Sequence, residues 1–152
     1  MVYTMFDPKL LDGVQTVHFI GCGGSGTYPL IQILHSQGYA ITGSDVEETK
    51  NTEAERALGV RVFIGHDAAN VGNAQLVVYS AAIHDDNPEL QAARARGIKA
   101  VERSVLLGYI SRSHPQSVGV AVVIHGSCYA LWLPPDLLRE AGREEIVVET
   151  PV

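Results

Sequence analysis

Short apolar runs alternate with amphipathic stretches along most of the chain. Several runs, such as Leu76-Val77-Val78-Tyr79, are apolar throughout, which is typical of strands that are buried on both faces of a sheet. We expect strands over residues 16–20, 39–43, 61–64, 76–80, 98–101 and 118–124.

The stretches between these runs carry apolar residues at helical spacing, together with start and stop signals for helices. The expected helices cover residues 25–37, 52–58, 88–96 and 104–111. Pro29 is tolerated in the first turn of the first helix, Thr52 opens a capping-box pattern in the second, and Asn87 is placed to cap the third. This alternation predicts an α/β fold: a Rossmann-like three-layer domain with a mostly parallel sheet.

The regular pattern weakens after residue 124. Pro134 and Pro135 would end any helix that begins at Ser127. Beyond them we expect a short helix over 137–141, and residues 146–148 are either a last strand or a frayed tail. The sequence therefore predicts one domain over residues 1–124 and a separate segment over residues 125–152.

A glycine motif follows the first expected strand. Gly21, Gly23 and Gly26 have the spacing G-x-G-x-x-G, and Asp45 stands 19 residues after Gly26. In such a motif the first glycine allows a tight turn, the second lets a phosphate approach the backbone, and the third lets helix and strand pack closely. A purely structural glycine turn is the alternative. The strand before the motif, the helix after it and the acid at this distance favour nucleotide binding.

Ligands of parallel α/β sheets bind at the carboxyl ends of the strands. The polar or small residues at those ends are Ser44, Asp45, His66, Ser80 and Ala81. Asp45 is either an acceptor for a ribose or base, or a solvated acid at a strand end. His66 is either a ligand contact or a plain loop residue.

Composition excludes several classes of function. The formal net charge of −6 and the lack of a basic stripe argue against nucleic acid. No apolar run approaches the ~18 residues of a membrane span, and the N-terminus lacks the pattern of a signal peptide. Two distant cysteines form no disulfide framework, so a cytoplasmic location is expected. No acid–base pair and no Cys/His cluster with metal-ligand spacing stands out, so we predict no catalytic residue and no metal site.

Five motifs occur together and in order: His18-Phe19-Ile20-Gly21-Cys22-Gly23-Gly24-Ser25-Gly26, Gly43-Ser44-Asp45, Phe63-Ile64-Gly65-His66, Val78-Tyr79-Ser80-Ala81-Ala82-Ile83 and Asp86-Asn87-Pro88-Glu89-Leu90. With them the chain resembles the N-terminal domain of the Mur ligases over residues 16–112. The resemblance is strongest to the branch that joins L-alanine to UDP-N-acetylmuramate in peptidoglycan synthesis. The branch that recycles murein peptides is similar in this region and is kept as an alternative.

The resemblance implies a Rossmann-like domain that holds the UDP part of a UDP-sugar, and not NAD, in the bacterial cytoplasm. It places Gly23, Gly24, Ser25 and Gly26 against the diphosphate. Asp45 and His66 would lie near the uridine, with Ser80 and Ala81 beside it. Asn87 would support its loop or touch the ligand, and Arg103 would face the substrate. The full family enzyme is an ATP-dependent ligase, and its two further domains bind ATP with Mg²⁺ and receive the amino acid.

The phosphate loop of the family, G-T-H-G-K-T-T, is degenerate in this chain. Ser127 stands at the lysine position and Cys128 at the position of the metal-binding hydroxyl. We therefore expect residues 125–152 to be a remnant of the ATP-loop segment, so that this chain binds neither ATP nor Mg²⁺ and is inactive by itself. A UDP-sugar is the expected partner. An NAD(P)-binding or nucleotide-sensing module and an inert remnant are the alternatives.

Overall fold

The computed structural model describes residues 7–114, 119–124 and 127–132, the last two segments by their backbone. The chain divides into two compact units, Met1–Ile110 and Ser111–Val152, and each is described by itself. The predicted domain boundary after residue 124 stays a prediction, and the helix and strand expected over 137–141 and 146–148 lie outside the described residues.

The first unit contains a five-stranded sheet with all strands parallel, in the order β3-β2-β1-β4-β5. Its strands are β1 (Thr16–Ile20), β2 (Ala40–Asp45), β3 (Arg61–Ile64), β4 (Leu76–Tyr79) and β5 (Lys99–Glu102). The helices are α1 (Tyr28–Ser36), α2 (Lys50–Ala57), α3 (Pro88–Ala95) and α4 (Arg103–Ser113), with a 3₁₀ turn η1 (Ala68–Val71) that the sequence pattern did not predict. The Rossmann-like α/β fold is thus confirmed.

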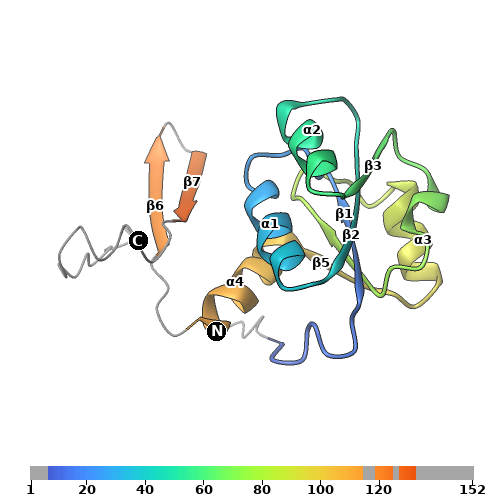
Figure 1. The fold of residues 1–152 in the computed structure, drawn as a ribbon, viewed down its shortest axis with the longest axis horizontal. Helices are drawn as coiled ribbons and strands as arrows, with labels where there is room; N and C mark the ends of the chain where they lie inside the picture. Colours follow the sequence, from blue (N-terminus) through green and yellow to red (C-terminus); the bar gives the residue numbers. More distant parts are fainter. Residues whose placement is uncertain (1–6, 115–118, 125–126, 133–152) are drawn as a thin grey trace. The chain divides into compact units, whose positions relative to one another are not determined.

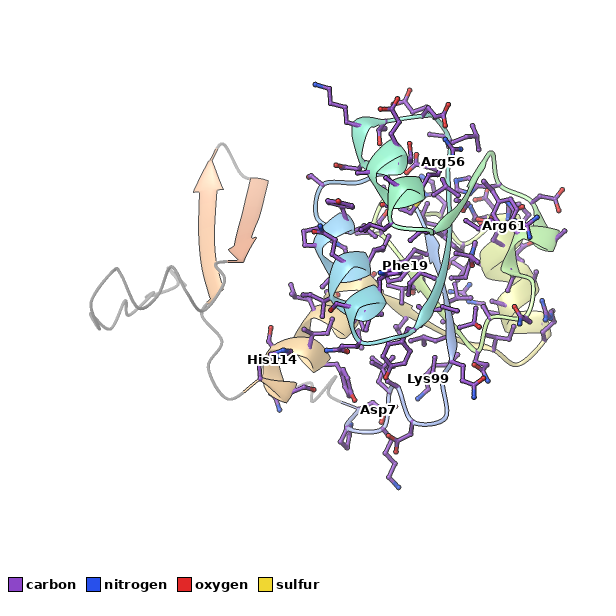
Figure 2. The ribbon with its side chains drawn as sticks, viewed as in Figure 1. Asp7, Phe19, Arg56, Arg61, Lys99 and His114 are labelled. Atoms are coloured by element: carbon purple, nitrogen blue, oxygen red, sulfur yellow. The ribbon has the colours of Figure 1, made fainter. Side chains whose placement is uncertain are left out.

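Helices cover both faces of this sheet (Figure 1). Alternation along β1 assigns the faces, because neighbouring side chains of a strand point in opposite directions. Phe19 packs in one apolar cluster with residues of α1 and α4, whereas Ile20 packs in the other with Leu90 of α3 and Val71 of η1. Figure 2 shows Phe19 in the interior, with Arg56, Arg61 and Lys99 toward the outside.

Local signals explain where the helices start. Asn87 caps α3, because its side-chain oxygen accepts the N–H groups of Glu89 and Leu90 at 2.9 and 3.2 Å. The capping box of α2 is one turn earlier than expected. Thr49 is the N-cap residue and exchanges hydrogen bonds with Thr52, so Thr52 closes the box instead of opening it. The prediction chose the wrong threonine as N-cap residue, because Thr49 and Thr52 are three residues apart and either could begin a helix.

The second unit contains a two-stranded antiparallel sheet of β6 (Gly119–Ile124) and β7 (Ser127–Trp132). The expected strand over 118–124 is therefore present, but its described partner is β7 and not a strand of the parallel sheet. The stretch after Ser127, where a helix could have begun, is also a strand. The aromatic residues Tyr129 and Trp132 are of a type that is enriched in strands.

Candidate nucleotide-binding site

The candidate site lies where the sheet reverses its winding. The chain passes from β3 at one edge to β4 on the other side of β1, so the switch point lies between the ends of β1 and β4. Ligands of open α/β sheets bind in this crevice. Gly21 follows β1 and Ser80 follows β4, and a Cβ atom on Gly21 would lie 3.0 Å from Ser80 Oγ. The structure thus brings the glycine loop and Ser80 together.

The glycine loop, residues 21–27, begins with a tight turn. Gly21 has a φ angle of +81°, which glycine adopts without strain, so its predicted role is confirmed. The N–H groups of Gly21 and Cys22 donate to the carbonyl of Ser44 at 2.8 and 3.0 Å. The end of β2 therefore fixes the first half of the loop.

Gly23 packs closely against the protein on one side. A Cβ atom there would lie 2.9 Å from Thr49 Oγ1 and 3.0 Å from both Asp45 Oδ2 and Thr52 Cγ2. This side of Gly23 faces Asp45 and the start of α2, and the expected contact of Gly23 with a diphosphate stays a prediction. The residue is small because the loop packs tightly against the protein itself.

Asp45 braces the glycine loop. Its Oδ2 atom accepts the N–H of Gly23 and its Oδ1 atom accepts the N–H of Val46, both at 2.8 Å. Asn51 adds a hydrogen bond from its amide to the carbonyl of Gly23 at 2.9 Å. A carboxylate oxygen can accept more than one hydrogen bond. The ligand contact of Asp45 stays a prediction, and its bracing of the loop is a second role.

Arg103, the first residue of α4, lies against Gly26. A Cβ atom on Gly26 would lie only 1.6 Å from Nη1 of Arg103 and 2.8 Å from its Cζ atom. The absence of a side chain at Gly26 therefore makes room for a guanidinium group, and its expected role in helix–strand packing stays a prediction. The result is a cation held beside the loop, although the two residues are far apart in sequence.

The second half of the loop leaves backbone donors free. The carbonyl of Gly24 accepts the N–H groups of Thr27 and Tyr28 at 2.9 and 3.2 Å, which starts the winding of α1. Within the described part of the chain, the N–H groups of Gly24, Ser25 and Gly26 have no acceptor. Free amides at the positive end of a helix, with Arg103 beside them, suit an anion such as a diphosphate.

A buried carboxylate, Glu89 of α3, joins two of the predicted site residues. Its Oε2 atom accepts the hydroxyl of Ser44 at 2.6 Å and lies 2.8 Å from Nδ1 of His66. Ser44 is fully buried, so its hydroxyl belongs to this network. Glu89 was not predicted as a site residue, because an acid in the first turn of a helix is usual. Its place in the matched stretch Asp86–Leu90 was the available signal.

The other predicted residues lie at the same end of the sheet. Ser80 is half-buried and Ala81 is exposed, both directly after β4. Asn87 supports its loop as the cap of α3. Val46 and Ile64, at the ends of β2 and β3, are exposed large apolar side chains. They offer apolar surface near Asp45 and His66.

Cys22 lies below the loop and is buried. A Cβ atom on Gly43 would be 2.7 Å from Cys22 Cβ, so the thiol fills the space that this glycine leaves. Burial, with the negative charge of Glu55 next in importance, raises the thiol pKa well above its usual range. Cys22 is therefore a packing residue, because a neutral thiol is a poor nucleophile.

A hollow of about 520 Å³ lies at the opposite end of the sheet, where β1 and β2 begin. Its lining is Val14, Gln15, Thr16, Gln37, Gly38, Tyr39 and Ala40. No charged side chain belongs to that lining, so it lacks a group that could neutralise a phosphate. The free amides of the glycine loop and Arg103 lie instead at the carboxyl end of the strands.

Comparisons with known proteins agree with this arrangement. Residues 16–115 match the sequence model of a family described as "Mur ligase family, catalytic domain". The chain belongs to the Mur ligase family. The UDP-N-acetylmuramate–L-alanine ligase of Acidiphilium cryptum is 43% identical over 135 residues, 89% of this chain and 28% of that relative. The enzyme of the same name from Gluconacetobacter diazotrophicus is 50% identical over 99 residues, 65% of this chain and 21% of that relative.

Two solved structures of Mur ligases share the fold. The UDP-N-acetylmuramate–alanine ligase of Thermotoga maritima superimposes with a TM-score of 0.59 at 35% identity, over 64% of this chain and 22% of that chain. A UDP-N-acetylmuramate:L-alanyl-gamma-D-glutamyl-meso-diaminopimelate ligase from Neisseria meningitides gives 0.54 at 24% identity, over 58% and 28%. The second likeness shows the fold alone. The chain spans less than a third of the length of these relatives.

The stretch aligned with the phosphate loop of Mur ligases does not have the geometry of such a loop. Cys128 pairs with Val123 and Ser127 with Ile124, in strand β7 running back along β6. A phosphate loop instead leads from a strand into the N-terminus of a helix, whose amides hold the phosphates. The backbone over residues 127–132 therefore lacks the strand-to-helix turn of a phosphate loop, and at Cys128 a soft sulfur stands where the family has a hard oxygen.

Among the residues that the structure describes, no group of three or more His, Cys, Asp and Glu side chains is arranged to hold a metal ion. No helix in that part of the chain is long and apolar enough to cross a membrane.

Proposed function

We propose that this chain is the N-terminal, UDP-N-acetylmuramate-binding domain of a UDP-N-acetylmuramate–L-alanine ligase. The full enzyme would act in peptidoglycan synthesis in the bacterial cytoplasm and would use ATP and Mg²⁺ bound by domains other than this one. In this role the chain binds the UDP part of the substrate and performs no chemistry itself.

The observation that carries the proposal is the contact between Gly26 and Arg103. It holds a guanidinium group beside three free backbone N–H groups at the start of α1. Charge-assisted hydrogen bonds to phosphate are among the strongest that proteins make. A diphosphate across this loop would satisfy the N–H groups of Gly24, Ser25 and Gly26 and would pair with Arg103.

The nucleoside would then extend over the ends of β2 and β3. Asp45 and His66 supply polar groups there, and Val46 and Ile64 supply apolar surface for the face of a base. Ser80 and Ala81 follow β4, which lies on the other side of β1 from these two strands. The 43% identity to a ligase named for UDP-N-acetylmuramate supports a UDP-sugar over NAD as the ligand.

Calorimetric titration of the purified chain with UDP-N-acetylmuramate, UDP and NAD tests the proposal. We expect UDP-N-acetylmuramate and UDP to bind and NAD to bind more weakly than either. Tight binding of NAD without a response to UDP would instead identify an NAD-binding module. A lack of heat with all three would favour an inert remnant.

A further inference from the structure

Glu89 connects polar groups from four elements around one buried carboxylate. These groups are His18 of β1, Ser44 of β2, His66 after β3 and Asn70 of η1. Asn70 donates to Glu89 Oε1 at 2.7 Å and also to the carbonyl of Gly65 at 3.2 Å. Both the ring of His66 and the backbone next to it are therefore tied to the same carboxylate.

The protonation state of Glu89 determines what His66 can do. Burial alone would raise the pKa of Glu89, but the nearby His18, whose Nε2 atom lies 3.5 Å from Oε1, and hydrogen bonds from Ser44 and Asn70 outweigh it and hold the pKa below its usual value of 4.5. Near neutral pH the group is thus a carboxylate, which can only accept hydrogen bonds. The 2.8 Å contact with Nδ1 of His66 therefore requires a hydrogen on Nδ1.

The other ring nitrogen of His66 faces a different situation. The side chain of His66 keeps 16% of its surface exposed, and Nε2 has no hydrogen bond to any residue that the structure describes. In a neutral ring with its hydrogen on Nδ1, Nε2 carries a lone pair and is an acceptor. A nucleoside offers matching donors, namely the imide N–H of a uracil and the hydroxyls of a ribose.

We propose that Glu89 is a positioning residue of the nucleotide site, which holds His66 in the Nδ1–H form and so presents Nε2 as an acceptor to a donor of the nucleoside. The inference rests on the proposed function, because a bound uridine supplies the donor. Glu89 itself does not touch the ligand, since its side chain is fully buried.

Nuclear magnetic resonance of the ligand-free chain tests the first half of the proposal. Long-range ¹H–¹⁵N correlations distinguish the two neutral forms of an imidazole, and the signals of His66 are those lost in His66→Gln. We expect the Nδ1–H form in the wild-type chain and a shift toward the Nε2–H form in Glu89→Leu. Glu89→Gln, which keeps a weaker neutral acceptor, serves if the leucine variant fails to fold, and a smaller shift in the same direction is expected.

Glu55→Gln is the matched control. Glu55 is also a fully buried glutamate on a helix, but it makes no hydrogen bond to a histidine. The signals of His66 should stay unchanged in this variant. A wild-type His66 in the Nε2–H form, or an unchanged His66 in the folded Glu89 variants, would overturn the proposal.

Titration with UDP tests the second half. We expect Glu89→Leu to raise the dissociation constant for UDP about tenfold, and to raise it no further in a His66→Gln background, because coupled residues are not additive. The same factor in both backgrounds would show that Glu89 acts without His66 and would overturn the proposal. If the wild-type chain gives no response to UDP, the proposed function fails and the presentation of Nε2 to a nucleoside fails with it. The imidazole spectra distinguish that outcome from a wrong assignment of the ring.

Discussion

Glu55 of α2 should make the first unit less stable as the pH rises toward neutrality. The residue is fully buried, and neither carboxyl oxygen has a hydrogen-bond partner in the described part of the chain. Burial raises its pKa from 4.5 to about 7. The neighbouring Cys22 thiol opposes this rise, and the negative charge of Asp45 adds a smaller contribution in the same direction as burial. The folded state therefore holds a proton more tightly than the unfolded state does.

The sign and size of the effect follow from this difference. The stabilisation from the protonated group is complete below pH 4.5, is lost progressively as the pH rises from 4.5 to about 7, and stays lost above that. A pKa difference of this size corresponds to roughly 3 kcal/mol, at about 1.4 kcal/mol for each pH unit. Glu55→Gln cannot ionise, so its free energy of unfolding relative to wild type should rise by up to roughly 3 kcal/mol between pH 4.5 and pH 8.

Urea unfolding followed by circular dichroism at several pH values measures this difference. All other titratable groups are common to both proteins, so their effects cancel in the comparison. Glu53→Gln, at an exposed position of the same helix, is the control and should differ from wild type by less than about 0.5 kcal/mol at every pH. A constant difference between Glu55→Gln and wild type across the range would refute the buried, protonated carboxyl.

Three further predictions concern the site. Arg103→Ala should weaken UDP binding by about 1.5–3 kcal/mol, which is the usual contribution of a hydrogen bond to a charged group. Arg94→Ala is the control: it removes only a surface ion pair with Asp85, so the UDP affinity measured by calorimetry should stay unchanged. Gly26→Ala should lower UDP affinity, because the new Cβ atom would displace the guanidinium group of Arg103. Gly24→Ala should keep the wild-type unfolding midpoint, because the atoms nearest to its new Cβ atom would be 3.6 Å away. An unfolding midpoint that falls equally in both variants would contradict the contact between Gly26 and Arg103. The isolated chain should release no phosphate from ATP when UDP-N-acetylmuramate, L-alanine and Mg²⁺ are present. The double variant Ser127→Lys, Cys128→Thr should be equally inactive. Turnover near the usual enzyme range of about 1–10³ s⁻¹ would contradict the conclusion that residues 127–132 form strand β7 and not a phosphate loop.

The sequence predicted the strands of the parallel sheet well because each is a short run that contains apolar residues and is bounded by turn or helix signals, and β4 is apolar throughout. The bounds of β1 and β3 match the expected ranges, and the other strands of the parallel sheet differ by a residue or two. The turn η1 was not predicted, because its four residues, Ala68–Val71, carry no periodic apolar pattern. The pairing of β7 with β6 was also missed, since a short apolar run does not reveal its partner.

The sequence predicted which strand ends and loops form the candidate site, but it did not predict the contacts among their residues. The spacing of Gly23 and Gly26 predicted that another group would pack closely against each of them. The sequence alone did not reveal which atoms occupy the space where a Cβ atom would be. Arg103 and the start of α2 proved to be those neighbours. Glu89 was missed for a similar reason, because its contacts with Ser44 and His66 come from folding three distant segments together.

Chemical-shift mapping of the ¹⁵N-labelled chain during titration with UDP-N-acetylmuramate tests the central claim most directly. We predict saturable shifts of the backbone amides of Gly24, Ser25 and Gly26, together with the ring of His66, and no comparable shifts at residues 37–40 in the hollow at the other end of the sheet. Shifts that gather in that hollow, or a glycine loop that responds to NAD and stays unchanged with UDP-N-acetylmuramate, would contradict the account.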